Sequence, residues 1–268
     1  MNTINADLIR RAMSPFKRES LAELETFREI GSTNSYLLEA GKPMPGHMRV
    51  AIAEQQTAGR GRRDKAWYSP PGAGLWMSVA YSFRVRPAHM SALTLAVGTA
   101  VASELADLGV SDILLKWPND LLVDERKLGG ILLESRANGM TAVVGIGINM
   151  ALPTNAEGHI KATRKPIDLS VLLATVPSID ALAAQLIERL VSTLQEFDRS
   201  GFESFATQWS KLDVLAGREI VVDRGGIKQT GIARGIATDG ALLLRNEEGL
   251  QRIISGSVST IDCEEAVA

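Results

Sequence analysis

The chain has 268 residues, of which 45% are hydrophobic and 22% charged, a composition that excludes a mainly disordered protein. Its formal net charge of −2 argues against a dedicated nucleic-acid binder, which usually carries a basic excess. The single cysteine, Cys263, excludes a disulfide within the chain, and the three histidines are too widely spaced in sequence for a typical metal site.

The N-terminal sequence predicts helices and strands in mixed order. Residues 1–20 are too polar for a signal peptide, and no apolar run is long enough to span a membrane, so we expect a cytoplasmic protein. A helical extension over residues 1–26 is predicted by helical spacing of Leu8, Ile9, Met13, Leu21 and Leu24. Ser32 or Thr33 can cap a short helix over residues 34–40. Extended patterns follow at 49–56 and 74–85, and a helix over 91–108 ends at Gly109.

Strand patterns dominate the middle of the chain, at residues 112–118, at 119–135 with a turn near 124–126, and at 141–150. Residues 151–178 predict a long loop that ends near a short helix starting at Ile167, and two helices follow over 180–197 and 202–212. This order fits an α+β fold with one mixed sheet and flanking helices better than a fold in which strands and helices alternate strictly. From residue 216, short apolar runs separated by RGG, TDG and EEG predict a small β-barrel-like domain.

A basic stretch, TAGRGRRDKAWY at residues 57–68, places its charges between glycines and aromatic residues. A dinucleotide-binding fingerprint fails because Asp64 stands where the third small residue belongs, and the chain contains no GxxxxGK[ST] sequence. A solvated charged surface is the plain alternative. Arginine forks suit phosphate oxygens, however, and glycine lets the backbone approach an anion closely. These features favour a loop that closes over a small phosphorylated ligand.

Three further stretches offer binding chemistry. KWPND at 116–120 and DERKLGG at 124–130 form a predicted hairpin, in which the glycines beside Lys127 would let it reach a carboxylate or phosphate. Glycines within the apolar strand VVGIGIN at 143–149 indicate close approach by a ligand or by another backbone. STN at 32–34 is either an ordinary helix cap or a set of ligand-binding groups. Neither GxSxG nor HExxH occurs, so covalent hydrolase chemistry finds no support.

Taken in this order, STN, AEQQTAGRGRR with its following tryptophan, KWPNDL with KLGGIL, and GIGIN resemble the biotin protein ligases. The resemblance implies that biotin is coupled to ATP with Mg²⁺ and then transferred to a lysine of a carboxylase carrier domain. It implies a catalytic domain like that of class II aminoacyl-tRNA synthetases over residues 27–214, after the extension 1–26, and an SH3-like domain over 215–268. Bifunctional members carry an N-terminal DNA-binding domain for which this chain has no room. We therefore expect a monofunctional enzyme, monomer or homodimer, with no DNA or membrane partner.

The resemblance also implies roles for individual residues. The chain departs from the family pattern at Gly129, where some relatives have alanine, and the segment after Asn149 shows little resemblance to the family. The biotin ureido ring would be bound by Ser32, Thr33, Asn34 and Gln56. Its pocket would be lined by Gly130, Gly145 and Gly147. The loop over biotin and phosphate would include Arg60, Gly61 and Arg62. The nucleotide end would be contacted by Arg63, Lys65, Trp67 and Asn149, together with Arg60, Arg62 and Lys127. We expect Lys127 to contact the biotin carboxylate and the α-phosphate, Arg62 to assist it, and Asp120 to position the acceptor amine. No protein metal site is expected.

Three alternatives stay open. Lipoate or octanoate ligases share the broad fold and act on similar carrier domains, although AGRGRR together with KWPND favours biotin. A regulator that senses biotin or its adenylate and binds DNA belongs to a different class, as does a binding protein without turnover. Binding of biotin or lipoate, binding of DNA, and modification of a carrier domain distinguish these possibilities.

Overall fold

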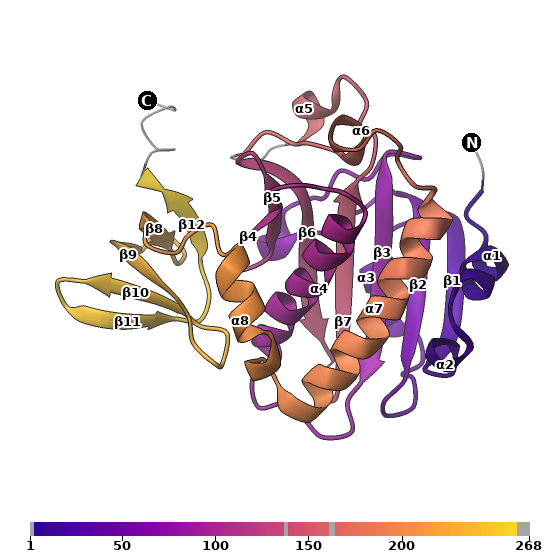
Figure 1. Cartoon of the computed structure of the whole chain (residues 1–268), viewed down its shortest axis with the longest axis horizontal. Helices are drawn as coiled ribbons and strands as arrows, with labels where there is room; N and C mark the ends of the chain where they lie inside the picture. Colours follow the sequence, from indigo (N-terminus) through magenta and orange to yellow (C-terminus); the bar gives the residue numbers. More distant parts are fainter. Residues whose placement is uncertain (1–2, 137–138, 161–163, 262–268) are drawn as a thin grey trace.

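The computed structural model describes residues 3–136, 139–160 and 164–261, so Cys263 lies outside the described residues. A seven-stranded sheet with the order β1-β2-β3-β7-β6-β5-β4 forms the larger part of the molecule (Figure 1). β1 runs parallel to β2, and the other neighbouring pairs are antiparallel. The strands are β1 (Leu21–Ile30), β2 (Met48–Gln56), β3 (Gly74–Ser82), β4 (Leu114–Lys116), β5 (Asp120–Val123), β6 (Arg126–Ser135) and β7 (Thr141–Asn149). The predicted mixed sheet is confirmed.

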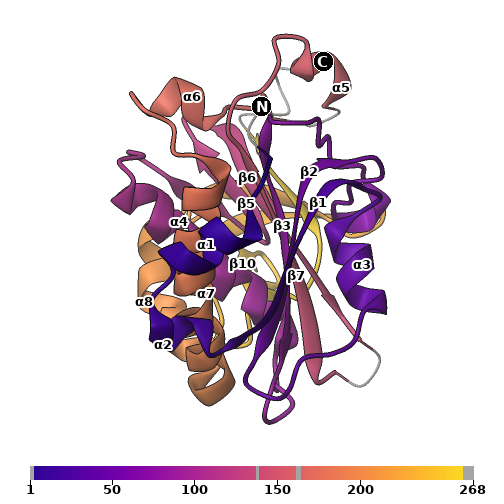
Figure 2. The same cartoon turned by 90° about the vertical axis from the view of Figure 1, so that its right-hand side faces the viewer.

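Helices cover the two faces of this sheet unequally (Figure 2). One face carries α1 (Ala6–Ala12), α2 (Pro15–Arg18), α4 (Leu93–Asp107), α7 (Ile179–Ser200) and α8 (Glu203–Leu212), whereas the opposite face carries the short α3 (Thr33–Glu39). Strand β3, in the interior of the sheet, is buried at every position because both of its faces are covered. α4 follows the short 3-10 helix η2 (Met90–Ala92), and its end at Gly109, which has a φ of 101°, is confirmed.

The predicted helical extension over residues 1–26 is wrong for its last part. Helix α2 ends at Arg18, and β1 starts at Leu21 as the edge strand of the main sheet. A β-bulge between Leu21 and Glu23 turns the buried side chains of Leu21 and Leu24 to the same face of the strand. Their three-residue spacing therefore imitates the period of a helix, and the sequence pattern alone cannot separate the two structures.

The described residues between β7 and α7 are mostly loop, as predicted, and they include two short helices, α5 (Ala156–His159) and α6 (Leu169–Leu172). Asp168 caps α6 by accepting a hydrogen bond from the backbone N–H of Ser170. The predicted start near Ile167 is thus two residues early. Within the part of the chain that the structure describes, no helix is long and apolar enough to cross a membrane.

The C-terminal region forms a second, five-stranded antiparallel sheet with the order β11-β10-β9-β8-β12. Its strands are β8 (Glu219–Asp223), β9 (Lys228–Ile236), β10 (Leu242–Asn246), β11 (Gly249–Ile253) and β12 (Ser257–Thr260), and the predicted small β domain is confirmed. Trp117 Nε1 donates to the Gly240 carbonyl across the junction with the main sheet at 3.1 Å. Arg218 and Glu125 form an ion pair across it at 2.9 Å.

Asp213 lies at this junction, between α8 and β8. Its Oδ1 accepts a hydrogen bond from the Leu215 N–H at 3.0 Å, whereas its buried Oδ2 has no partner among the described residues. Burial raises the pKa of the Asp213 carboxyl, and the Leu215 hydrogen bond opposes this shift. Because the pKa is higher in the folded state, the group favours folding at low pH, and this contribution is lost as the pH rises through the folded-state pKa.

We therefore expect Asp213→Asn to raise the melting temperature at pH 7.5 by about 2 °C, since a neutral amide costs less to bury than a carboxylate. The oxygen of the new side-chain amide can still accept the Leu215 hydrogen bond. The difference from wild type should shrink from pH 7.5 towards pH 4, because the raised pKa lets the wild-type carboxyl take up its proton as the pH falls. Thermal melts of both proteins across this range test the prediction, and a difference that is constant with pH would contradict it.

Candidate active site

Three glycines lie together on the face of the sheet that carries α3. Gly130 on β6 is directly opposite Gly147 on β7, and Gly145 is two residues before Gly147. A Cβ atom at Gly147 would lie 2.7 Å from the Trp67 ring, and one at Gly145 would lie 2.8 Å from Asn34 Oδ1. Side chains from the basic loop and from α3 thus rest directly on bare backbone. We call Gly130, Gly145 and Gly147 the glycine floor.

Buried polar residues surround this floor at the start of α3. Ser32 caps the helix by accepting a hydrogen bond from the Ser35 N–H, which confirms the predicted cap. Thr33 donates from its N–H to Gln56 Oε1 at 2.9 Å, and its hydroxyl lies 2.7 Å from that of Ser78. Gln56 in turn donates from Nε2 to Ser69 Oγ at 3.0 Å. Several polar side chains are therefore buried beside glycines, a lining that suits a polar ligand better than an apolar core.

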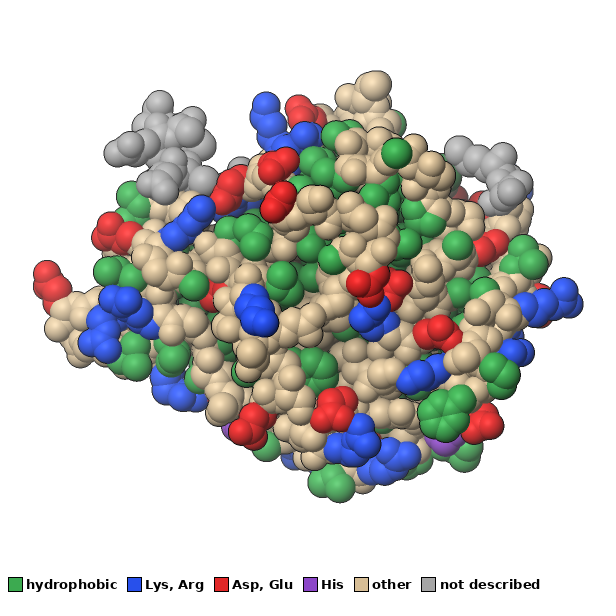
Figure 3. Space-filling model, viewed as in Figure 1, with side chains coloured by type: hydrophobic (Ala, Val, Ile, Leu, Met, Phe, Trp, Pro, Cys, Tyr) green, Lys and Arg blue, Asp and Glu red, His purple; other side chains and the backbone are tan. Residues whose placement is uncertain are grey.

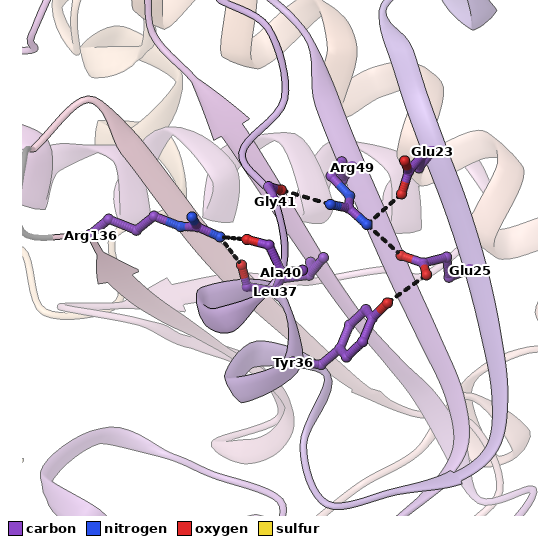
Figure 4. A network of polar contacts seen from close by, with 8 residues as sticks. All are labelled: Glu23, Glu25, Tyr36, Leu37, Ala40, Gly41, Arg49 and Arg136. Carbon is purple, nitrogen blue, oxygen red and sulfur yellow. Dashed lines mark hydrogen bonds and ion pairs between the residues drawn. The ribbon is translucent and has the colours of Figure 1, made fainter.

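Helix α3 is held against the sheet by a polar network outside the floor (Figure 4). Arg136 donates to two carbonyls at the C-terminal end of α3, where positive charge is favourable. Tyr36 donates its phenolic proton to Glu25 on β1, and this hydrogen bond raises the pKa of Tyr36. The network contains Glu23, Glu25, Tyr36, Leu37, Ala40, Gly41, Arg49 and Arg136. The STN residues at the start of α3 therefore sit on a firmly anchored element.

The arginines of the basic loop contact different parts of the molecule. Arg60 makes two hydrogen bonds to Glu134 on β6, at 2.9 and 3.0 Å. Arg62 donates to the Gly256 carbonyl at 3.5 Å, and Arg63 donates to Ser257 Oγ at 2.6 Å, both in the second sheet domain. Lys65 is exposed. The loop thus spans the space between the glycine floor and the C-terminal domain.

The backbone of this loop forms a narrow turn around the 3-10 helix η1 (Arg62–Asp64). The Gly61 N–H donates to the Lys65 carbonyl at 2.7 Å, and Arg63 and Asp64 both have positive φ, which is uncommon for residues other than glycine. Burial lowers the pKa of the Arg62 guanidinium, the charge of Arg63 lowers it further, and Asp120 opposes the shift. A partly buried cation of this kind interacts strongly with an anion that enters beside it.

Lys127 lies at the edge of the floor. Its Nζ is 2.6 Å from Asp120 Oδ1 and 5.2 Å from the centre of the Trp67 ring, and both charged side chains are 22% exposed. The two residues come from β5 and β6, which are joined by a turn in which Asp124 and Glu125 have positive φ. The predicted hairpin is confirmed, and it brings a cation, a carboxylate and an indole together.

Asn149 lies next to Lys127 but faces backbone. Its buried amide nitrogen donates to the carbonyls of Lys127 and Ile167, at 3.2 and 3.0 Å. The Lys127 N–H donates to the Lys165 carbonyl at 2.9 Å, so segment 165–167 runs beside the lysine. The structure therefore places Asn149 where it supports the backbone of Lys127, and the nucleotide contact expected from the sequence stays a prediction.

The sequence did not single out Glu134, Ser69 or Ser78. Glu134 follows the KLGGIL stretch, and its only signal is a carboxylate beside the apolar run of β6. Tyr68 was expected to offer a stacking surface, but its partner was not predicted: its ring stacks on that of His159 with centroids 4.9 Å apart. These partners lie far apart in the sequence. Only the sheet order and the path of segment 151–160 bring them together.

Apart from the glycine floor, a hollow lies between α4, α7 and α8, on the face shown in Figure 3. Its polar groups bond to one another: Arg189 pairs with Glu104 and Asp107, and the Ser103 hydroxyl donates to the Thr99 carbonyl. The glycine floor differs, because the buried atoms Asn34 Oδ1 and Trp67 Nε1 have no hydrogen-bond partner within the described ranges. Within the same ranges, no group of three or more histidine, cysteine, aspartate or glutamate side chains could hold a metal ion. We therefore take the glycine floor and its surroundings as the active-site candidate.

Residues 27–150 match the Biotin/lipoate A/B protein ligase family, and residues 216–260 match the Biotin protein ligase C terminal domain. These matches define the class of protein, the ligases that act with biotin or lipoate. The chain is 37% identical over 239 residues to the bifunctional ligase/repressor BirA of Salmonella typhimurium, covering 88% of this chain and 73% of that protein.

Two other comparisons agree. The chain is 29% identical to the biotin–[acetyl-CoA-carboxylase] ligase of Paracoccus denitrificans, over 85% of this chain and 96% of that protein. The biotin protein ligase of Aquifex aeolicus in complex with biotin and ATP superposes with a TM-score of 0.75 at 26% identity, covering 89% of this chain and 99% of that one. The chain belongs to the biotin protein ligase family.

Proposed function

We propose that this protein activates biotin with ATP to form biotinyl-5′-AMP and transfers the biotinyl group to a lysine of a carboxylase carrier domain. Family membership supports the reaction class, and the names of the relatives support biotin as the substrate. The observation that carries the proposal is the convergence of Lys127, Asp120 and Trp67 at the edge of the glycine floor. Mg²⁺ enters as the partner of the ATP phosphates.

In the first step, a biotin carboxylate oxygen attacks the α-phosphorus of ATP, and the bond to pyrophosphate breaks. Two anions must approach each other, so positive charge at the site lowers the barrier. Lys127 supplies a point charge at the edge of the floor, and residues 60–65 carry a net charge of +3. The partly buried Arg62 is the loop cation whose charge is least screened by water. The loop would also shield the adenylate from hydrolysis.

In the second step, the amine of the acceptor lysine attacks the carbonyl carbon of the adenylate, and AMP leaves. The amine must first lose its proton, and a carboxylate at the reacting centre can accept it. Asp120 Oδ1 lies 2.6 Å from Lys127 Nζ, so it would be beside the carboxyl and the phosphate if Lys127 contacts both. We therefore assign Asp120 the role of positioning the acceptor amine and taking its proton.

We also propose how the chain is divided into domains and which partners it binds. The main sheet with its helices would act as the catalytic unit to residue 214, and β1 places residues 21–26 within this unit rather than in an extension. The described residues from 215 on would form the C-terminal domain. We propose a carrier domain as the partner and no DNA, with the enzyme acting as a monomer or homodimer. The net charge of −2 supports the absence of DNA, and positive and negative side chains are interspersed on the face shown in Figure 3.

Titration calorimetry with biotin and lipoate tests the substrate. We expect biotin to bind with a Kd of about 1 μM or tighter, and we expect no heat signal from lipoate at the same concentration. Binding of lipoate without binding of biotin would reject the assignment in favour of the other branch of the family.

A further inference from the structure

Glu134 connects two groups at the site that come from separate parts of the chain. Its side chain, 23% exposed, receives two hydrogen bonds from Arg60 of the basic loop and one from Asn34 Nδ2, at 2.7 Å, on α3. By strand alternation, Glu134 lies on the same face of β6 as Gly130. The residue therefore sits on the floor side of the sheet, next to the start of α3.

These contacts fix which way the Asn34 amide points. Both Glu134 oxygens accept hydrogen bonds from Arg60, so the Asn34 group that faces Glu134 must be its NH₂ group. The amide oxygen is then turned away. That oxygen is buried, has no hydrogen-bond partner among the described residues, and lies where a Cβ at Gly145 would meet it at 2.8 Å. Glu134 therefore sets the direction of a buried, unpaired acceptor that lies against the glycine floor.

We infer that Glu134 is a positioning residue that orients Asn34, so that Asn34 Oδ1 accepts an N–H of the ligand ring. The inference rests on the proposed function and specifies how the site selects its substrate. A cyclic urea carries N–H donors, whereas the dithiolane ring of lipoate carries none. A ligand without a donor leaves the buried oxygen unpaired, which costs about 10- to 100-fold in affinity.

The same carboxylate links recognition of the ring to the basic loop. Arg60 donates to Glu134 through both of its terminal nitrogens, and its Nη1 is also 3.4 Å from Ser35 Oγ on α3. A purely electrostatic role for Glu134 would be to balance the charge of Arg60. Orientation of Asn34 is a separate role, because it predicts a change in selectivity between ligands that differ by one N–H group.

The test compares biotin with two analogues, each methylated on a different ureido nitrogen, by calorimetry on the full chain. In wild type, one analogue should bind about 10- to 100-fold more weakly than biotin because it cannot donate to Asn34. Glu134→Gln has nearly the same shape but can donate, so Asn34 is free to turn over. In this variant the affinity for biotin should fall by about tenfold. The ratio of the affinities for biotin and for that analogue should then be about threefold or less.

Glu134→Asp keeps a carboxylate, which can only accept hydrogen bonds. This variant should therefore preserve the difference in affinity between biotin and the weaker analogue. Glu219→Gln, an exposed change on β8, serves as the matched control and should bind all three ligands as wild type does. If Glu134→Gln lowers the affinity for biotin and for both analogues by the same factor, or leaves the ratio of these affinities as in wild type, the orienting role of Glu134 is wrong. If wild type binds no biotin, the proposed function fails, and this inference fails with it.

Discussion

Lys127→Ala should reduce the rate of adenylate formation by about a thousandfold, because it removes the cation next to the transferring phosphate. The melting temperature should change by no more than about 3 °C. Both Lys127 and its partner Asp120 are 22% exposed, so water can solvate the carboxylate that is left behind. Biotin-dependent exchange between pyrophosphate and ATP measures the adenylation step without a carrier domain.

Lys211→Ala is the matched control for this variant. Lys211 is an exposed lysine on α8, on the other face of the sheet, and its loss should leave exchange unchanged. Exchange at the wild-type rate by a folded Lys127→Ala protein would refute the role assigned to this lysine. The same result would show that the basic loop alone stabilises the transition state.

Asp120→Asn should separate the two half-reactions. The adenylate should form within about threefold of the wild-type rate, because the cation Lys127 remains beside the phosphate. Transfer to the carrier lysine should slow by about 10²- to 10⁴-fold, the range expected when a general base is removed. A single-turnover experiment, in which preformed adenylate is mixed with a carrier domain, measures the transfer step by itself.

Asp124→Asn offers a control on the same hairpin. Asp124 is exposed at the turn with a φ of 49°, a conformation that asparagine adopts readily, so this variant should transfer biotin normally. Transfer by Asp120→Asn at the wild-type rate would assign deprotonation of the amine to another group. A loss confined to the adenylation step would instead place Asp120 in the first half-reaction.

Most of the fold could be predicted from local patterns in the sequence. The hairpin around residues 124–126, the helix ending at Gly109 and the short strands after residue 216 each carry turn chemistry that predicts them. β1 was missed because a bulge gives Leu21 and Leu24 a helical spacing. Its parallel pairing with β2 also depends on α3 lying between them in the chain, which periodicity in the sequence does not report.

The candidate site, like the fold, could be predicted only in part from the sequence. Glycines within an apolar strand and a lysine beside Gly-Gly were visible locally, and the structure brings them together. Glu134 was not visible, because its contact with Asn34 joins residues 100 positions apart and depends on the order of β3, β7 and β6. The contacts of Arg62 and Arg63 with residues 256 and 257 span even more of the chain, 194 positions each. The sequence predicted a mobile loop over a ligand but not its contact with the C-terminal domain.

The mass of an isolated carrier domain, measured after incubation with this protein, biotin, ATP and Mg²⁺, is the decisive test of biotin transfer. We expect the carrier to gain the mass of one biotinyl group, omission of ATP to prevent the gain, and lipoate not to replace biotin. A carrier that stays unmodified, although the protein binds biotin and ATP, would show a binding protein without turnover and would refute the proposed ligase activity.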